Sequence, residues 1–157
     1  MATDSVRRDE RSGLTILELM VALAILGLLL ALVPPALDGV SSRWRLRTAA
    51  QHVAATVQWA RNAASIEDRP VEVLYDVPDD SFWVRDGQQT HAFHSLPRGV
   101  HLDWVRFGSI EVTGDVASCT ALPDGTVDAH QVMLRSDDDA EIRISFDRLT
   151  GEPFYDR

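Results

Sequence analysis

The histidines of this chain are candidate metal ligands, because imidazole nitrogens bind zinc and related metals. His91 and His94 lie three positions apart, and His101 follows nearby. On an extended strand a spacing of three places two side chains on opposite faces, so His91 and His94 are expected to point apart. No cluster of cysteines accompanies them. The sequence therefore predicts no metal site at these histidines.

The carboxylates could bind a hard cation or exchange protons. The run Ser136-Asp137-Asp138-Asp139 lacks the spaced acids and the glycine of an EF-hand loop, so it predicts a solvated turn. Asp79 and Asp80 are adjacent, which does not favour an acid–base pair. The sequence also contains no nucleophile or phosphate-binding motif. We therefore expect neither an enzyme nor a cofactor.

Glu18 is the residue whose position most needs a chemical explanation. The residues from Leu19 to Val33 include nothing more polar than Gly27, and an ionised carboxylate in lipid is costly unless it has a partner. If the chain is cut between Gly13 and Leu14, the new α-amino group lies four residues before Glu18 and can neutralise it. The amine of one subunit could also meet Glu18 of a neighbour, so Glu18 is predicted to set the registry of an assembly.

The apolar segment around these residues is long enough to span a membrane. Residues 14–37 would form ~36 Å of helix at ~1.5 Å per residue, against a hydrocarbon core of ~30 Å. A secretory signal peptide is the main alternative, and it should end in a small-x-small cleavage site. The segment ends instead in Val33-Pro34-Pro35-Ala36-Leu37. Arginines flank the segment on both sides, so charge does not fix its orientation.

The residues from Gly13 to Val21 resemble the cleavage and methylation motif of type IV pilins and type II secretion pseudopilins. That motif has a glycine, an aromatic or aliphatic residue, a glutamate at the fifth mature position, and then an apolar run. Leu14 departs here from the commonest choice, phenylalanine. The resemblance implies that residues 1–13 are a leader cut off after Gly13, that Leu14 is N-methylated, and that Glu18 acts in assembly. It also implies a single-pass protein of the cell inner membrane with its C-terminal domain in the periplasm.

Two prolines divide the expected N-terminal helix. Pro34 and Pro35 each remove a hydrogen-bond donor, so a kink is predicted there. Residues 38–68 are predicted to continue as an amphipathic helix that ends before Pro70. Its small apolar stripe consists of Leu46, Ala50, Val53, Val57, Ala60 and Ala64, and its polar face of Arg45, Gln51, Gln58, Arg61 and Asn62.

Residues 69–157 predict a compact antiparallel β domain, because short strand-like segments alternate with turn signals. The segments are Val71–Asp76, Ser81–Arg85, Thr90–His94, Val100–Phe107, Gln131–Arg135 and Glu141–Phe146. The fold class is therefore α+β: a long N-terminal helix, transmembrane in its first half, packed on an antiparallel domain as in pilins. The lone Cys119 and the aromatic Trp83, Trp104 and Phe107 are predicted to be buried, and Trp44 to lie at the membrane interface.

The second half is similar to the H-type minor pseudopilins of type II secretion. The motifs that carry this are Ala60-Arg61-Asn62-Ala63-Ala64, Leu122-Pro123-Asp124-Gly125-Thr126 and Ile144-Ser145-Phe146-Asp147-Arg148-Leu149-Thr150-Gly151. The resemblance implies a subunit near the tip of a periplasmic pseudopilus that drives export of folded proteins across the outer membrane. Its implied partners are other major and minor pseudopilins, a prepilin peptidase, an inner-membrane assembly platform and inner-membrane lipid.

Two alternatives remain open at the level of sequence. One is a minor pilin of a type IV pilus, acting in assembly or DNA uptake; the other is a membrane-anchored periplasmic enzyme or binding module. A DNA-binding pilin should carry a basic patch on its globular part. The formal net charge of −9 repels phosphate backbones, so no nucleic-acid partner is expected.

Overall fold

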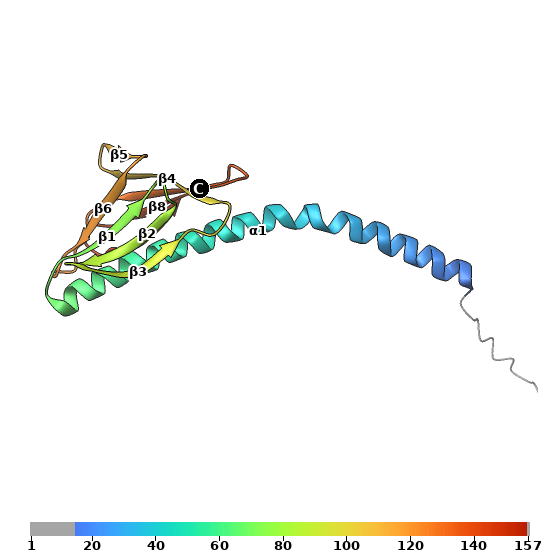
Figure 1. The fold of residues 1–157 in the computed structure, drawn as a ribbon, viewed down its shortest axis with the longest axis horizontal. Helices are drawn as coiled ribbons and strands as arrows, with labels where there is room; N and C mark the ends of the chain where they lie inside the picture. Colours follow the sequence, from blue (N-terminus) through green and yellow to red (C-terminus); the bar gives the residue numbers. More distant parts are fainter. Residues whose placement is uncertain (1–14, 157) are drawn as a thin grey trace, which may run out of the picture. The chain divides into compact units, whose positions relative to one another are not determined.

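The computed structural model describes residues 15–156, and their side chains except at 29–41 and 92. The chain divides into two compact units, Met1–Leu37 and Asp38–Arg157. Helix α1 (Ile16–Glu67) begins in the first unit and ends in the second, and strands follow it along the chain (Figure 1). Within the described residues, no helix is long and apolar enough to qualify as a membrane span.

The second unit contains two antiparallel sheets. One sheet has the order β3-β2-β1-β6 and the other the order β5-β4-β7-β8-β9. The strands are β1 (Val71–Asp76), β2 (Ser81–Asp86), β3 (Gln89–Ser95), β4 (Val100–Phe107), β5 (Ile110–Val112), β6 (Val116–Ala121), β7 (Gln131–Ser136), β8 (Glu141–Phe146) and β9 (Pro153–Asp156). The α+β class is thus confirmed, with strands at all six predicted places.

Three strands were not predicted, and each lacks a strong strand signal. The short β5 is largely exposed. In β6 the buried side chains are the small Ala117, Cys119 and Ala121, which carry little β propensity. The edge strand β9 begins at Pro153, a residue that sheets tolerate only at such positions.

The end of α1 follows from local backbone chemistry. Asp68 adopts a left-handed conformation with φ of 52°, and the Arg69 N–H donates to the Ala64 carbonyl oxygen at 3.3 Å. This six-to-one bond is the Schellman termination, here with aspartate in the place that glycine usually takes. Pro70 follows and cannot extend the helix. The predicted end before Pro70 is confirmed.

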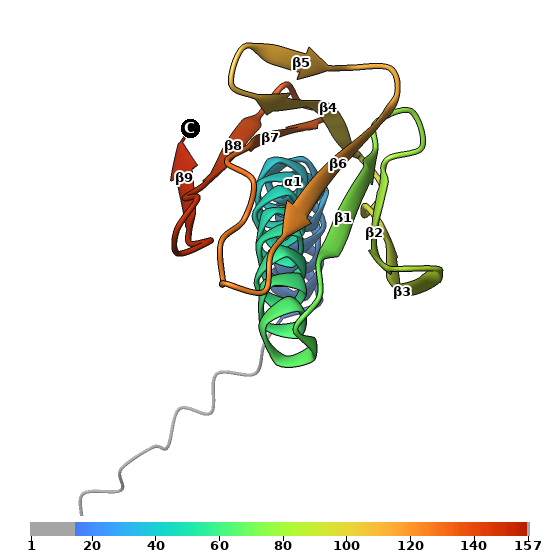
Figure 2. The ribbon, with the colours of Figure 1, turned by 90° about the vertical axis from the view of Figure 1, so that its left-hand side faces the viewer.

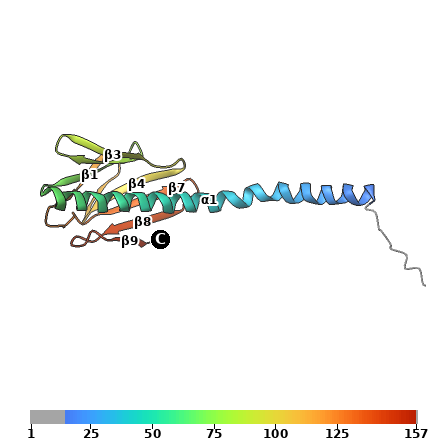
Figure 3. The same ribbon diagram turned by 90° about the horizontal axis from the view of Figure 1, so that it is seen from below.

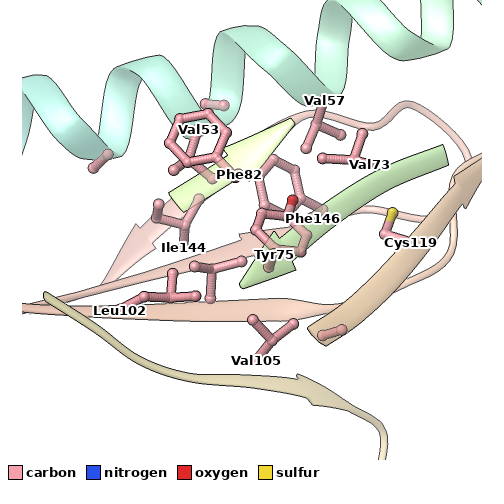
Figure 4. Packing of buried hydrophobic residues seen from close by; sticks show 14 of the residues in the cluster. Val53, Val57, Val73, Tyr75, Phe82, Leu102, Val105, Cys119, Ile144 and Phe146 are labelled. Atoms are coloured by element: carbon pink, nitrogen blue, oxygen red, sulfur yellow. The ribbon is translucent and has the colours of Figure 1, made fainter. Parts of the chain in front are cut away.

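The second unit's part of α1 lies in the angle between the two sheets (Figure 2). All six residues of the predicted stripe are at most 4% exposed and belong to one core with side chains of both sheets. Val53 and Val57 of α1 point toward Tyr75, Phe82 and Ile144 in this core (Figure 4). The stripe is small because both sheets approach the same helix closely.

Parts of the predicted polar face and of the predicted core are placed differently. Arg45, Gln58 and Arg61 are half-buried rather than solvated, because loops cover that side of α1. Cys119 and Trp104 are buried as predicted, with Trp104 under the Arg106 guanidinium at 4.2 Å.

Two further aromatic side chains are only half-buried. Phe107 is half-buried and packs against the core. Trp83 is half-buried and stacks on the exposed Phe93, so its predicted core position is wrong.

Candidate functional site

The first turn of α1 is organised by Thr15 and Glu18. The Glu18 backbone N–H donates to the Thr15 side-chain oxygen at 3.2 Å, and the Leu19 N–H donates to the Thr15 carbonyl oxygen at 3.1 Å. A threonine followed three positions later by glutamate is the sequence pattern of a capping box, and an acid in the first turn favours the helix dipole. Glu18 therefore belongs to the helix start, a role signalled by Thr15 that the sequence analysis missed.

Glu18 is the one acid in a helical segment whose apolar side chains face every direction. All side chains from Thr15 to Leu28 are exposed, with Ile16 at 81%, Leu17 at 74% and Leu28 at 66%. A helix that is apolar on every face is stable only when lipid or protein covers it. This segment therefore presents a continuous apolar surface with a single carboxylate at its start.

The other residues predicted for this site are only partly placed. Gly13 and Leu14 lie outside the described residues, so cleavage and N-methylation there stay predictions. Pro34 and Pro35 lie within the bounds of α1, and the kink predicted at them stays a prediction. The division into residues 1–13, 14–37, 38–68 and 69–157 likewise stays a prediction, as does the interface position of Trp44, which is 70% exposed.

The histidines of β3 contradict the predicted alternation. His91 pairs with Val84 and His94 with Phe82, so β3 contains one extra residue, a β-bulge. The ring of His91 lies 6.1 Å from that of Trp59, and the ring of His94 lies 6.5 Å from that of His52, both on α1. The two rings thus face α1 together, and the prediction of opposite faces was wrong because the bulge changes the period.

His101 contacts two carboxylates, one of which belongs to the acidic turn at Asp137–Asp139. His101 bonds through Nδ1 to Asp80 at 2.7 Å and through Nε2 to Asp137 at 3.0 Å. These two carboxylates raise the pKa of His101. Asp137, Asp138 and Asp139 are exposed, as predicted for a solvated turn, and Asp138 also accepts a hydrogen bond from the buried Ser42 hydroxyl of α1. Within residues 15–156, no three histidine, cysteine or acidic side chains are grouped to hold a metal.

Two motifs that suggested the H type cover one side of α1. The Arg61 Nε donates to the Gly125 carbonyl oxygen at 2.6 Å, and the Gln58 side-chain amide donates to the Gly151 carbonyl oxygen. Both glycines have positive φ, 83° and 63°. These motifs therefore fasten two loops to the helix and are structural.

A buried polar pair lies between the sheets. The Tyr75 hydroxyl and His130 Nε2 are 3.0 Å apart, and His130 Nδ1 lies 2.7 Å from the Asp128 carbonyl oxygen. The His130 ring stacks on Phe146 at 4.5 Å. Burial lowers the pKa of His130 to about 4, so the ring is neutral at physiological pH. His130 is thus a core residue with a polar partner at each ring nitrogen.

Comparisons with known proteins agree with these features. The family model described as the prokaryotic N-terminal methylation motif matches residues 8–34. The comparison with curated proteins found no match.

Two similar solved structures are a minor pseudopilin and a minor pilin. The minor pseudopilin EpsH from the type 2 secretion system of Vibrio cholerae has a TM-score of 0.53 at 14% identity, over 71% of this chain and 95% of that one. The type IV minor pilin FimU of Pseudomonas aeruginosa has a TM-score of 0.55 at 14% identity, over 75% and 92%. At this identity the likeness concerns the fold. The chain therefore contains a prokaryotic N-terminal methylation motif and has a fold similar to those of this minor pseudopilin and this minor pilin.

Proposed function

We propose that this chain is a minor pseudopilin of the type II secretion system. Residues 14–37 hold it in the inner membrane, and residues 69–157 form its periplasmic domain. The observation that carries the proposal is the first segment of α1, which lies within the residues matched by the methylation motif and is apolar on every face except at Glu18. Such a surface must contact apolar groups both before the subunit assembles and after it enters the fibre.

Lipid provides these apolar contacts before assembly, and neighbouring subunits provide them in the fibre. A prepilin peptidase cuts after Gly13 and methylates the amine of Leu14. This amine, in its cationic form, neutralises the Glu18 carboxylate of a neighbour. A subunit out of register would leave the Glu18 charge unpaired in an apolar surrounding, at a cost of several kcal/mol.

The role in the fibre is structural. The subunit joins other major and minor pseudopilins near the tip on the inner-membrane assembly platform, and the pseudopilus drives folded proteins across the outer membrane. The resemblance of the loops at Gly125 and Gly151 to the H type supports this position. No chemical step is assigned to the chain.

Substitution of Glu18 by glutamine tests the proposal in the native host. The Glu18→Gln chain should be inserted and cleaved normally, while co-purification of other pseudopilins and secretion both fall. Glu67→Gln is the matched control, because Glu67 is an exposed acid at the opposite end of α1. If Glu18→Gln assembles and secretes like the wild-type chain, the proposed registry is wrong.

A minor pilin of a type IV pilus is the second candidate, favoured by the structural similarity to FimU. Deletion of the gene separates the two. Loss of secretion with intact pili supports the pseudopilin, whereas loss of pili with normal secretion supports the pilin. Salt-sensitive DNA binding by the purified chain would favour a pilin of the DNA-capturing kind.

A further inference from the structure

We propose that a basic groove beside α1 binds the phosphate headgroup of an anionic phospholipid. The groove, of about 560 Å³, is lined by Arg43, Trp44 and Arg47 of α1, by Glu141 of β8 and by Tyr155 of β9, among others. It lies wholly in the second unit. The inference rests on the proposed function for its membrane location.

The fold brings the groove residues together from two elements. Arg43 and Arg47 are four positions apart on α1, so their side chains lie on the same face one turn apart. Strand β9 flanks α1 on the side opposite β3 (Figure 3). Tyr155 pairs with Ile144, whose side chain is fully buried in the core formed with α1. Paired residues share a sheet face, so Tyr155 also faces α1.

The two arginines of the groove are available for an anion. Both are exposed, and neither makes an ion pair or a hydrogen bond within the described part of the chain. Arg85, Arg106 and Arg135, in contrast, are all paired with acids. The acid that lines the groove, Glu141, is itself bound by Arg135 at 2.9 Å. The groove therefore keeps an excess of positive charge on a chain whose net charge is −9.

The aromatic side chains favour a lipid headgroup over an acidic protein segment. Trp44 is 70% exposed and Tyr155 is 46% exposed, and both combine an apolar ring with a polar group. Such rings concentrate at the level of lipid headgroups, as do arginines that follow an apolar helix. Arg43 follows closely after the proposed anchor, residues 14–37. The pair of guanidiniums would hold the phosphate, with the two rings beside it.

The test is a calorimetric titration of the detergent-solubilised full chain with soluble short-chain phosphatidylglycerol. Phosphatidylcholine with the same acyl chains and inorganic phosphate are the comparison ligands. Phosphatidylglycerol should bind more tightly than both, and less tightly as salt is added. An arginine near an anionic surface strengthens binding about fivefold, so Arg43→Gln with Arg47→Gln should weaken phosphatidylglycerol binding about 25-fold.

Arg98→Gln is the matched control, because Arg98 is exposed, lies outside the groove and has no ion pair among the described residues. It should bind like the wild-type chain. Equal affinity for both lipids, or a preference that survives the double substitution, would overturn the proposal. Phosphate binding as tight as lipid binding would assign the groove to a free anion. Loss of a partner subunit from the double variant, with unchanged lipid binding, would assign it to a protein.

Failure of the proposed function gives a different result. Carbonate extraction of the wild-type chain from native membranes would contradict the anchor and both proposals together. A chain that resists extraction but shows no lipid preference would overturn the groove assignment alone.

Discussion

The Arg61 side chain lies between two loops that are far apart in the sequence. Its Nε donates to the Gly125 carbonyl oxygen at 2.6 Å, and its Cδ lies 3.0 Å from the position that a Cβ on Gly151 would occupy. One arginine of α1 thus contacts both loops that carry the H-type motifs. The helix thus adds side-chain contacts to loops that the β8–β9 pairing and the Ala121–Val127 bridge also close.

Arg61→Ala should destabilise the second unit. A hydrogen bond to a charged donor contributes about 1.5–3 kcal/mol, and the substitution also removes packing beneath the Gly151 loop. Chemical denaturation of the purified chain should show a loss of unfolding free energy in this range. Asn62→Ala, at the exposed neighbouring position, should change it by about 0.5 kcal/mol or less. Equal effects at the two positions would contradict a stabilising role of the Arg61 contacts with the two loops.

Gly151→Ala should be more harmful than Gly87→Ala. Both glycines have similar positive φ, 63° and 57°, so each alanine incurs about 1–2 kcal/mol of backbone strain. A Cβ at Gly87 meets nothing within 4 Å, whereas one at Gly151 lies 3.3 Å from Val127 and 3.4 Å from Gln58. Thermal unfolding should therefore separate the two variants, with Gly151→Ala melting lower. Equal melting temperatures would contradict the prediction, because they would show that the Gly151 loop accommodates the added Cβ without loss of stability.

His130 should make the fold acid-sensitive. Burial lowers its pKa to about 4, while the unfolded chain binds a proton near pH 6.5. The unfolded state therefore gains protons first as pH falls, and stability is lost progressively from about pH 6.5 to about pH 4, by about 3 kcal/mol. His130→Asn should flatten this slope, as measured by denaturation at several pH values. An unchanged slope would contradict a neutral buried ring.

His101 should give a slope of opposite sign. Hydrogen bonds to Asp80 and then Asp137 raise its pKa, so the folded state holds the proton to higher pH than the unfolded state. Its stabilisation is present below about pH 6.5 and is lost as pH rises through the raised pKa. His101→Gln should remove the decline on the alkaline side, whereas His52→Gln, at an exposed histidine without such partners, should not. A decline that persists in His101→Gln would contradict this pairing.

Much of the fold could be predicted because burial leaves a periodic signal. The stripe from Leu46 to Ala64 repeats with the period of a helix, and the alternation of Ile142, Ile144 and Phe146 repeats with that of a strand. Strand β6 escaped because its buried residues are small, and the orientation of His91 and His94 was wrong because a bulge is invisible to period counting. Local patterns do not record where one strand gains a residue over its partner.

The sequence predicted only those features of the candidate site that depend on residues close together along the chain. Glu18 was found because a charge in an apolar run needs an explanation, and Thr15 could have been found from the capping pattern. The contacts of Arg61 and Ser42 depend on loops that return from distant positions, about which helical periodicity says nothing. The same holds for the basic groove, which exists only because β9 lies beside α1.

The processing of the N-terminus tests the proposed role of Glu18 most directly. Mass spectrometry of the chain isolated from membranes of its native host should find Leu14 as the first residue, carrying one methyl group on its amine. That amine is the proposed partner of Glu18. A chain that retains residues 1–13 would lack this partner and would contradict the proposed assembly.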